Sequence, residues 1–213
     1  MKKNFYILNR RQLTKSSLIA TAATFVNFKS LFAKLTLTDQ NVKDKRILGD
    51  DNAKISVIEY FSMTCGHCAD FHNDTFPKLK TNLIEKGVIN FEMRPFPLDG
   101  LALRAHAICR AVSKKKYYYM VKSFLSDQDK WIKSDDPIVS IKKIARKAGI
   151  SEKTYNYIMS NKSYLEEFIK EREYASQKYG ITSTPSFVIN NSKVIKGSVS
   201  YTEFLKKLNE FNI

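Results

Sequence analysis

The order of apolar patterns along this 213-residue chain predicts an α/β domain that is interrupted by a helical insertion. Runs of β-branched and aromatic residues, typical of strands, occur before residue 99 and after residue 184. Between residues 100 and 178 the apolar residues recur with helical period instead. Hydrophobic residues make up 43% of the chain and glycine and proline are scarce, so we do not expect wholesale disorder.

The first part of the chain predicts a strand, a helix and a second strand. Residues 54–61 form an apolar run suited to a buried central strand, and residues 69–83 have helical character. Residues 88–95 alternate like a second strand, so this unit should give a parallel pair. We expect residues 34–47 to be a lead-in strand or loop and residues 48–53 to form a turn.

The last part of the chain predicts a hairpin and a closing helix. Two strand-like runs, 185–189 and 193–195, flank Asn190 and Asn191, which favour a tight turn and hence an antiparallel pair. Residues 202–211 then read as a final helix.

The N-terminal 33 residues have the pattern of an export signal. A basic beginning precedes a short apolar segment at 16–28, and Ala33 is a small residue suited to a cleavage site. The alternative is that the segment is retained as a membrane anchor. Either outcome predicts a location outside the cytoplasm, in the periplasm, where disulfides form and persist.

The charge balance is basic, with 36 Lys and Arg against 21 Asp and Glu. Six of these cations lie in the first 33 residues, and elsewhere only residues 114–116 are clustered. Nucleic-acid binding would require a concentrated basic face with interleaved aromatic residues, so we expect no nucleic-acid partner.

The motif Cys-Gly-His-Cys at 65–68 lies where the predicted central strand turns into a helix. The free N–H groups and the macrodipole of a helix N-terminus stabilise a thiolate there, which is the chemistry of a dithiol–disulfide exchanger. The alternatives are a structural disulfide or half of a zinc site. Zinc needs about four ligands, and beyond His67 the chain offers only His72 and His106, so we expect no metal and no cofactor.

With these elements in place, the chain resembles the thioredoxin superfamily, and within it the DsbA-like thiol:disulfide oxidoreductases of the bacterial envelope. The resemblance rests on the strand 57–62, the motif at 65–68, Phe71 on the following helix, and Thr-Ser-Thr-Pro-Ser-Phe-Val-Ile at 182–189. It implies a thioredoxin-like fold with an inserted all-helical domain. The core would comprise residues 48–99 and 179–213, and the insertion residues 100–178.

The two motif cysteines receive different expected roles. Cys65, at the helix start, should be the exposed nucleophile, and Cys68, one turn further, the buried resolving thiol. We expect an imidazolium at His67 to favour the Cys65 thiolate; the alternative is a plain surface residue. The resemblance adds that Pro-His between the cysteines marks strong oxidants and Gly-Pro the reducing thioredoxins; Gly66-His67 shares the histidine of the oxidants but lacks their proline. We therefore expect an oxidising enzyme, but the motif does not determine its reduction potential.

Three further residues are expected to support the site. Glu59, the acid in the central strand, would be buried and relay a proton to or from Cys68, unless it faces solvent at a strand edge. Arg94 is a candidate for a positive charge near it. The resemblance implies a cis peptide bond before Pro185, which would bring Thr184 beside Cys65 to pair with an extended substrate; the alternative is a trans proline opening a strand.

The third cysteine, Cys109, lies on a predicted apolar helix and has no fourth cysteine to pair with. We interpret it as an inert core thiol.

The leading functional hypothesis is an enzyme that donates its disulfide to newly exported proteins with free thiols. The resemblance implies a membrane reoxidase as second partner. The exchange reaction needs no prosthetic group and the sequence signals none, and we expect a monomer. A disulfide isomerase or a reductase of the same superfamily is the alternative, favoured by Thr184 and by the glycine in the motif. A binding module without turnover is a third possibility, which the intact pair of cysteines disfavours.

Overall fold

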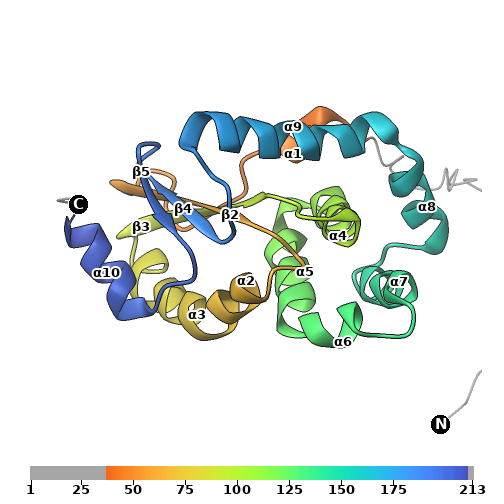
Figure 1. Ribbon diagram of the computed structural model, residues 1–213, viewed down its shortest axis with the longest axis horizontal. Coiled ribbons are helices and arrows are strands. Elements are labelled where there is room, and N and C mark those ends of the chain that lie inside the picture. Colours follow the sequence, from red (N-terminus) through yellow and green to blue (C-terminus); the bar gives the residue numbers. More distant parts are fainter. Residues whose placement is uncertain (1–36, 211–213) are drawn as a thin grey trace, which may run out of the picture. The chain divides into compact units, whose positions relative to one another are not determined.

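A five-stranded mixed sheet organises residues 37–210, the part of the chain that the computed structural model describes (Figure 1). The expected signal peptide or anchor, residues 1–33, lies outside the described residues. No helix within 37–210 is long and apolar enough to cross a membrane.

The strands follow the spatial order β1-β3-β2-β4-β5. Their bounds are β1 Ile47–Leu48, β2 Ile55–Phe61, β3 Ile89–Pro95, β4 Ser186–Ile189 and β5 Lys193–Lys196. The parallel pairing of β2 with β3 and the antiparallel hairpin of β4 with β5 are confirmed. Asn190 and Asn191 have φ of 47° and 56°, the left-handed region that a tight hairpin turn requires.

The two faces of the sheet bury side chains against different helices. The chain from the end of β2 forms a continuous helical segment of four pieces: α2 Gly66–Asp70, η1 Phe71–Thr75, α3 Phe76–Leu79 and η2 Lys80–Ile84. The two η pieces are π-helical turns on either side of Pro77. Figure 1 shows this segment and α10 (Tyr201–Glu210) on one face of the sheet, and α9 (Lys162–Tyr179) on the other.

Residues on β2 alternate between these faces, as the period of a strand requires. Phe61 faces the helical segment, where its ring lies 6.1 Å from that of His72. Ile58 and Tyr60 belong to a second buried cluster with Ala175 of α9. β2 is therefore the buried central strand that its composition predicts, and the motif begins four residues after its end.

The predicted helical stretch 100–178 is confirmed as consecutive helices. They are α4 Gly100–Ala111, α5 Lys114–Ser126, α6 Gln128–Ile132, α7 Pro137–Lys147, α8 Glu152–Ser160 and α9. Side-chain caps fix several N-termini: Asp99 accepts from Ala102 N, and Asp136 accepts from Val139 N. These helices belong to the same compact unit as the sheet.

The expectation for residues 34–47 is wrong in one respect, because α1 (Asp39–Lys43) is a helix rather than a strand or loop. Its N-terminus is a capping box in which Thr38 and Asn41 satisfy each other's backbone N–H groups. Val42 buries its side chain, and α1 packs against α9. The strand β1 also begins at Ile47, so the expected boundary at residue 48 falls inside a strand.

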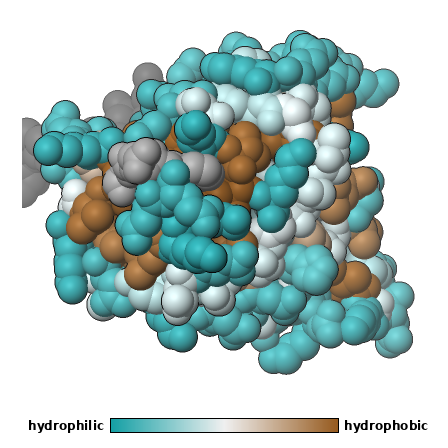
Figure 2. All heavy atoms as spheres, turned by 60° about the vertical axis from the view of Figure 1, so that its left-hand side comes forward, coloured by the Kyte–Doolittle hydropathy of each residue, from teal (hydrophilic) through white to brown (hydrophobic). Residues whose placement is uncertain are grey.

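One edge of the sheet is β5, which exposes Lys193 and Lys196. Lysines on an edge strand oppose pairing with another chain. Figure 2 turns this side toward the viewer and shows hydrophilic side chains around a hydrophobic area.

Candidate active site

Cys65 occupies the N-cap of α2, with the extended backbone that this position requires. Its Sγ is partly exposed and donates a hydrogen bond to the carbonyl oxygen of Thr184 at 3.3 Å. The pKa of Cys65 falls to about 5, chiefly because the Cys68 thiol donates a hydrogen bond to it. Burial opposes this shift, whereas the backbone N–H groups of Cys68 and His67 add to it. Cys65 is therefore the cysteine that is already a thiolate at neutral pH.

Cys68 lies one turn further along and has no exposed surface. Burial raises its pKa well above the ordinary value, and the hydrogen bond to Cys65 and the charge of Glu59 act in the same direction. Both motif cysteines are thiols in this structure, so it describes the dithiol form. The pair is thus asymmetric, with an accessible thiolate outside and a protonated thiol inside, as the sequence predicts.

The second half of the sheet reaches the motif through the loop before β4. The Thr184–Pro185 peptide bond is cis, which confirms the expectation for Pro185. Thr184 is buried, and its Oγ1 has no hydrogen-bond partner among the described residues. That Thr184 pairs with an extended substrate stays a prediction.

Gln128, at the first position of α6, holds the motif from the helical insertion. Its Nε2 donates to the carbonyl oxygens of Met63 (2.9 Å) and Cys65 (3.0 Å), and the side chain is buried. Sequence reasoning missed this residue because it lies about 60 positions away in a region read only for helical period. The insertion therefore contacts the backbone of the nucleophile directly.

Glu59 is fully buried on β2, as expected, but its partner is not the expected one. The carboxylate Oε2 lies 2.9 Å from Nε2 of His72, which comes from η1. Arg94 instead binds Glu92 (3.1 Å) and Glu171 (3.3 Å). The expectation for Arg94 is wrong because it occupies the β3 position beside Tyr60, whereas Met93 is the neighbour of Glu59. Successive strand residues face opposite sides of a sheet.

His72 was considered only as a zinc ligand from the sequence. The signal that could have identified it is its spacing, because residues four apart lie on the same helix face. His72 follows Cys68 by four positions, and this helical segment packs over Glu59 of β2.

His67 keeps its side chain in solvent, with Nδ1 3.7 Å from the carboxylate of Asp70. Its backbone N–H contributes to the lowered pKa of Cys65. Stabilisation of the thiolate by the His67 imidazolium stays a prediction.

The remaining thiol and histidine are buried away from solvent. Cys109 lies on α4 with no exposed surface, and burial raises its pKa, consistent with a core thiol. Burial lowers the pKa of His106 to about 3, so this imidazole is neutral. Within residues 37–210, no group of three or more His, Cys, Asp or Glu side chains is arranged to hold a metal ion.

Comparison with known proteins places these features in a family. The model of the thioredoxin family matches residues 41–210. The chain belongs to the thioredoxin family. It is DsbA-like within it: the crystal structure of α-DsbA1 from Wolbachia pipientis superimposes with a TM-score of 0.70 at 27% identity, covering 78% of this chain and 90% of that one.

Two curated relatives of this DsbA-like chain carry related names. A putative protein-disulfide oxidoreductase of Rickettsia bellii is 28% identical over 155 residues, which are 72% of this chain and 60% of that protein. Disulfide bond formation protein D of Bacillus subtilis is 25% identical over 171 residues, 76% of this chain and 75% of that protein. The chain spans only about half to three fifths of the rickettsial relatives.

Proposed function

We propose that this protein is a thiol:disulfide oxidoreductase that introduces disulfide bonds into exported proteins through Cys65 and Cys68. The observation that carries the proposal is the placement of a partly exposed Cys65 at the N-cap of α2 with Cys68 buried one turn further, which displaces their pKa values in opposite directions. A stabilised Cys65 thiolate stabilises the dithiol form relative to the disulfide. The disulfide is then correspondingly oxidising.

The reaction needs only the two cysteines and the client. A client thiolate attacks Sγ of Cys65, the Cys65–Cys68 bond breaks, and Cys68 receives the electron pair and a proton. A second client thiolate then attacks the client sulfur of the mixed disulfide and expels Cys65 as its stabilised thiolate. The client is oxidised by two electrons, and the enzyme is left as the dithiol.

The cellular location, the clients and the reoxidising partner are inferred from the sequence and from the names of the relatives. The N-terminal segment supports export to the periplasm, where folding proteins with free thiols are the clients. Because each turnover leaves a dithiol, a membrane reoxidase must restore the disulfide. We propose that the protein acts as a monomer without a prosthetic group.

A disulfide isomerase or reductase is the alternative, and two observations favour it. Thr184 precedes the cis proline, and Gly66 replaces the proline of the strongest oxidants. Both roles use the same nucleophile but start from the dithiol rather than from the disulfide.

Oxidative refolding separates these functions. The oxidised protein, incubated with a reduced, unfolded client, should transfer its disulfide stoichiometrically, as measured by loss of client thiols. The Cys65→Ser variant should transfer nothing, and Cys68→Ala should accumulate a mixed disulfide when supplied with oxidised client. Efficient rearrangement of scrambled client by the dithiol form, with poor transfer from the disulfide form, would instead establish the isomerase. Unchanged suppression of client aggregation by Cys65→Ser, with no transfer by wild type, would indicate a binding module.

A further inference from the structure

Cys68 has no direct route to solvent, although the exchange proposed above moves a proton at this sulfur in every turnover. Its side chain has no exposed surface. When the Cys65–Cys68 bond breaks, the electron pair goes to Cys68, and burial makes an unprotonated sulfur unfavourable there. A buried group must therefore deliver the proton, and the following inference rests on the proposed function.

Glu59 is the buried acid placed to deliver it. It has no exposed surface either, and it contacts His72, which follows Cys68 by one turn on the same helical segment. Its charge also acts on the Cys68 thiol. Oε2 is occupied by His72 at 2.9 Å, whereas Oε1 has no hydrogen-bond partner among the described residues. A carboxyl with one free oxygen in a buried site can exchange a proton with a nearby sulfur, but it must itself be recharged from solvent.

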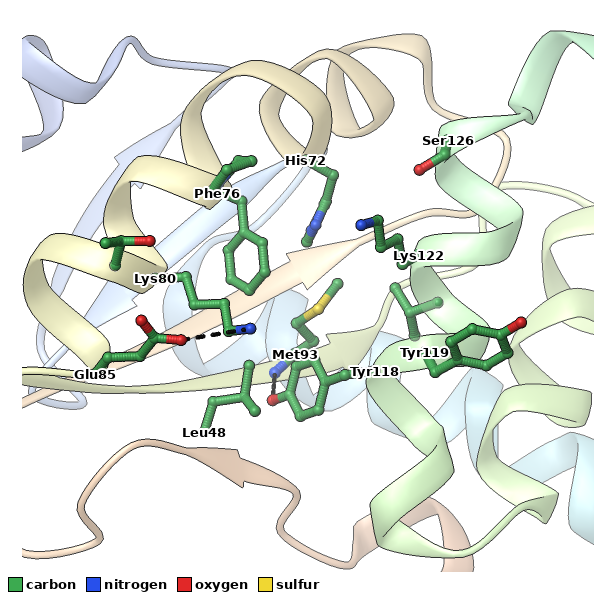
Figure 3. A pocket seen from close by; sticks show the side chains of 13 residues that line it. Leu48, His72, Phe76, Lys80, Glu85, Met93, Tyr118, Tyr119, Lys122 and Ser126 are labelled. Atoms are coloured by element: carbon green, nitrogen blue, oxygen red, sulfur yellow. Dashed lines mark hydrogen bonds and ion pairs between the residues drawn. The ribbon is translucent and has the colours of Figure 1, made fainter.

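His72 connects this carboxyl to a surface pocket. The pocket, of about 420 Å³, lies between the helical segment after β2 and α5, and His72 and Met93 are part of its lining. Figure 3 shows the His72 ring pointing from its helix into the pocket. The His72 side chain is 6% exposed, against 0% for Glu59, so exposure begins at the imidazole.

Aromatic rings hold the imidazole in this orientation. The centroids of Phe76, Phe71 and Phe61 lie 4.8, 5.5 and 6.1 Å from that of His72. Within residues 37–210, Glu59 is the hydrogen-bond partner found for this ring. Because this hydrogen bond uses Nε2, the second ring nitrogen, Nδ1, is the one left to exchange protons.

The other polar groups that line the pocket do not substitute for His72. Lys80 pairs with Glu85 at 3.6 Å, and Lys122 comes from α5. The Tyr118 hydroxyl donates to the backbone carbonyls of Arg46 and Phe91, and burial raises its pKa well above the ordinary value. Among the described residues, none of these groups makes a hydrogen bond to Glu59.

We infer that His72 is a proton-relay residue, which positions the Glu59 carboxyl and carries protons between it and solvent through the pocket lined by Phe76, Met93 and Tyr118. As the disulfide opens, the Glu59 carboxyl gives its proton to the Cys68 sulfur. The resulting carboxylate takes a proton from His72 Nε2, and water in the pocket returns one to Nδ1. On reoxidation the same steps run backward, so the relay leaves Glu59 and His72 unchanged over a full cycle.

A role of His72 in proton transfer and a purely structural hydrogen bond from His72 to Glu59 predict different rates for a His72→Gln variant. If His72 only holds Glu59 in place, His72→Gln, whose amide can still donate to the carboxylate, should keep the wild-type rate at every pH. If His72 conducts protons, this variant should slow the opening of the disulfide roughly tenfold to 100-fold. Its rate should also lose the pH dependence contributed by the imidazole.

The test measures reduction of the oxidised full-length protein by dithiothreitol under single-turnover conditions between pH 5 and 8. His72→Gln and His72→Ala are compared with wild type and with Thr81→Ala, a control that alters the same pocket away from the relay. Added imidazole should restore much of the rate of His72→Ala, because the vacated ring volume adjoins a pocket that can hold it. It should leave wild type and Thr81→Ala unchanged.

Parallel pH profiles for wild type and His72→Gln, together with no imidazole effect on His72→Ala, would overturn the relay. Because dithiothreitol attacks Cys65 whatever the natural client is, this result is independent of the client assay. Failure of wild type to oxidise a client protein would instead overturn the proposed function.

Discussion

The two faces of the central strand pair each bury carboxylates against a basic group, but the two bases differ. On the face toward α2 and η1, Glu59 pairs with His72. On the face toward α9, Arg94 lies between Glu92 and Glu171. An imidazole gains and loses its proton in the physiological range, whereas a guanidinium stays charged.

The Glu59–His72 pair can therefore exchange protons, whereas Arg94 with Glu92 and Glu171 forms an ion cluster of fixed charge. Burial works against the charged form of Arg94, but Glu92 and Glu171 overcome it and hold its pKa above the ordinary value. The α9 face therefore carries a fixed ion cluster that ties β3 to the helix. The face under the motif carries the exchangeable pair, next to the sulfur that needs a proton.

The largest expected effect comes from breaking the fixed cluster. Arg94→Met leaves Glu92 and Glu171 buried without their counter-charge, and removing one partner of a buried pair typically costs about 3–5 kcal/mol. We expect the free energy of unfolding in urea to fall by that amount. The rate of disulfide exchange of the folded variant should stay within about twofold of wild type. A large kinetic defect in a stable Arg94→Met protein would contradict the division between the faces.

The second effect concerns the exchangeable pair. Glu59→Gln removes the acid beside Cys68, and loss of a positioned general acid slows proton transfer by about 10²-fold or more. Stopped-flow reduction of the disulfide at pH 7 measures this rate. Glu171→Gln makes the same chemical change on the opposite face and serves as the matched control, with lowered stability but an unchanged rate. Equal rates for the two variants would contradict the prediction.

A third prediction concerns the contact between the insertion and the motif. Gln128→Ala leaves the Met63 and Cys65 carbonyls without this donor, and an unsatisfied buried group costs about 1–3 kcal/mol. We also expect the pH midpoint of Cys65 alkylation to rise above that of wild type as the motif loosens. Gln128→Glu, similar in size but unable to donate when ionised, should show the same direction. A midpoint unchanged in both variants would show that the insertion does not position the nucleophile.

A fourth effect is a pH dependence of stability in the dithiol form alone. The pKa of folded Cys65 is about 5, while an unfolded cysteine titrates near about 8.5. Between these values the unfolded state binds more protons, so the free energy of unfolding rises with pH. This contribution is full above pH 8.5 and is lost as the pH falls through 5. Denaturant titrations at several pH values should show reduced minus oxidised stability increasing from pH 5 to 8, and a flat or falling difference would be inconsistent with the lowered pKa.

The order of elements could be predicted because strands and helices leave different periods in the sequence. The apolar run of β2, the alternation in β3 and the asparagine turn before β5 each have a local cause. The helix α1 was missed because Thr38 and Asn41 form a capping box without the usual Glu or Gln, before only one buried residue, Val42.

The candidate site likewise contains residues that a local pattern locates and residues that only tertiary packing places. Cys65, Cys68 and the cis bond at Pro185 lie in motifs with fixed spacing, so the sequence located them. Whether Met93 or Arg94 lies beside Glu59 depends on the register of β2 with β3, and a shift of one residue exchanges them. The pairing of Glu59 with His72 depends on the packing of η1 against β2. Gln128 reaches the motif only through the packing of α6, which no local pattern records.

A redox titration tests the central claim, that the stabilised Cys65 thiolate makes this protein a donor of disulfides. The protein is equilibrated in buffers of graded reduced-to-oxidised glutathione ratio, and the fraction of Cys65–Cys68 disulfide is measured by thiol trapping. The account predicts a reduction potential more positive than about −200 mV, in the range of oxidising family members. A potential near about −270 mV, that of thioredoxin, would contradict it and favour a reductase.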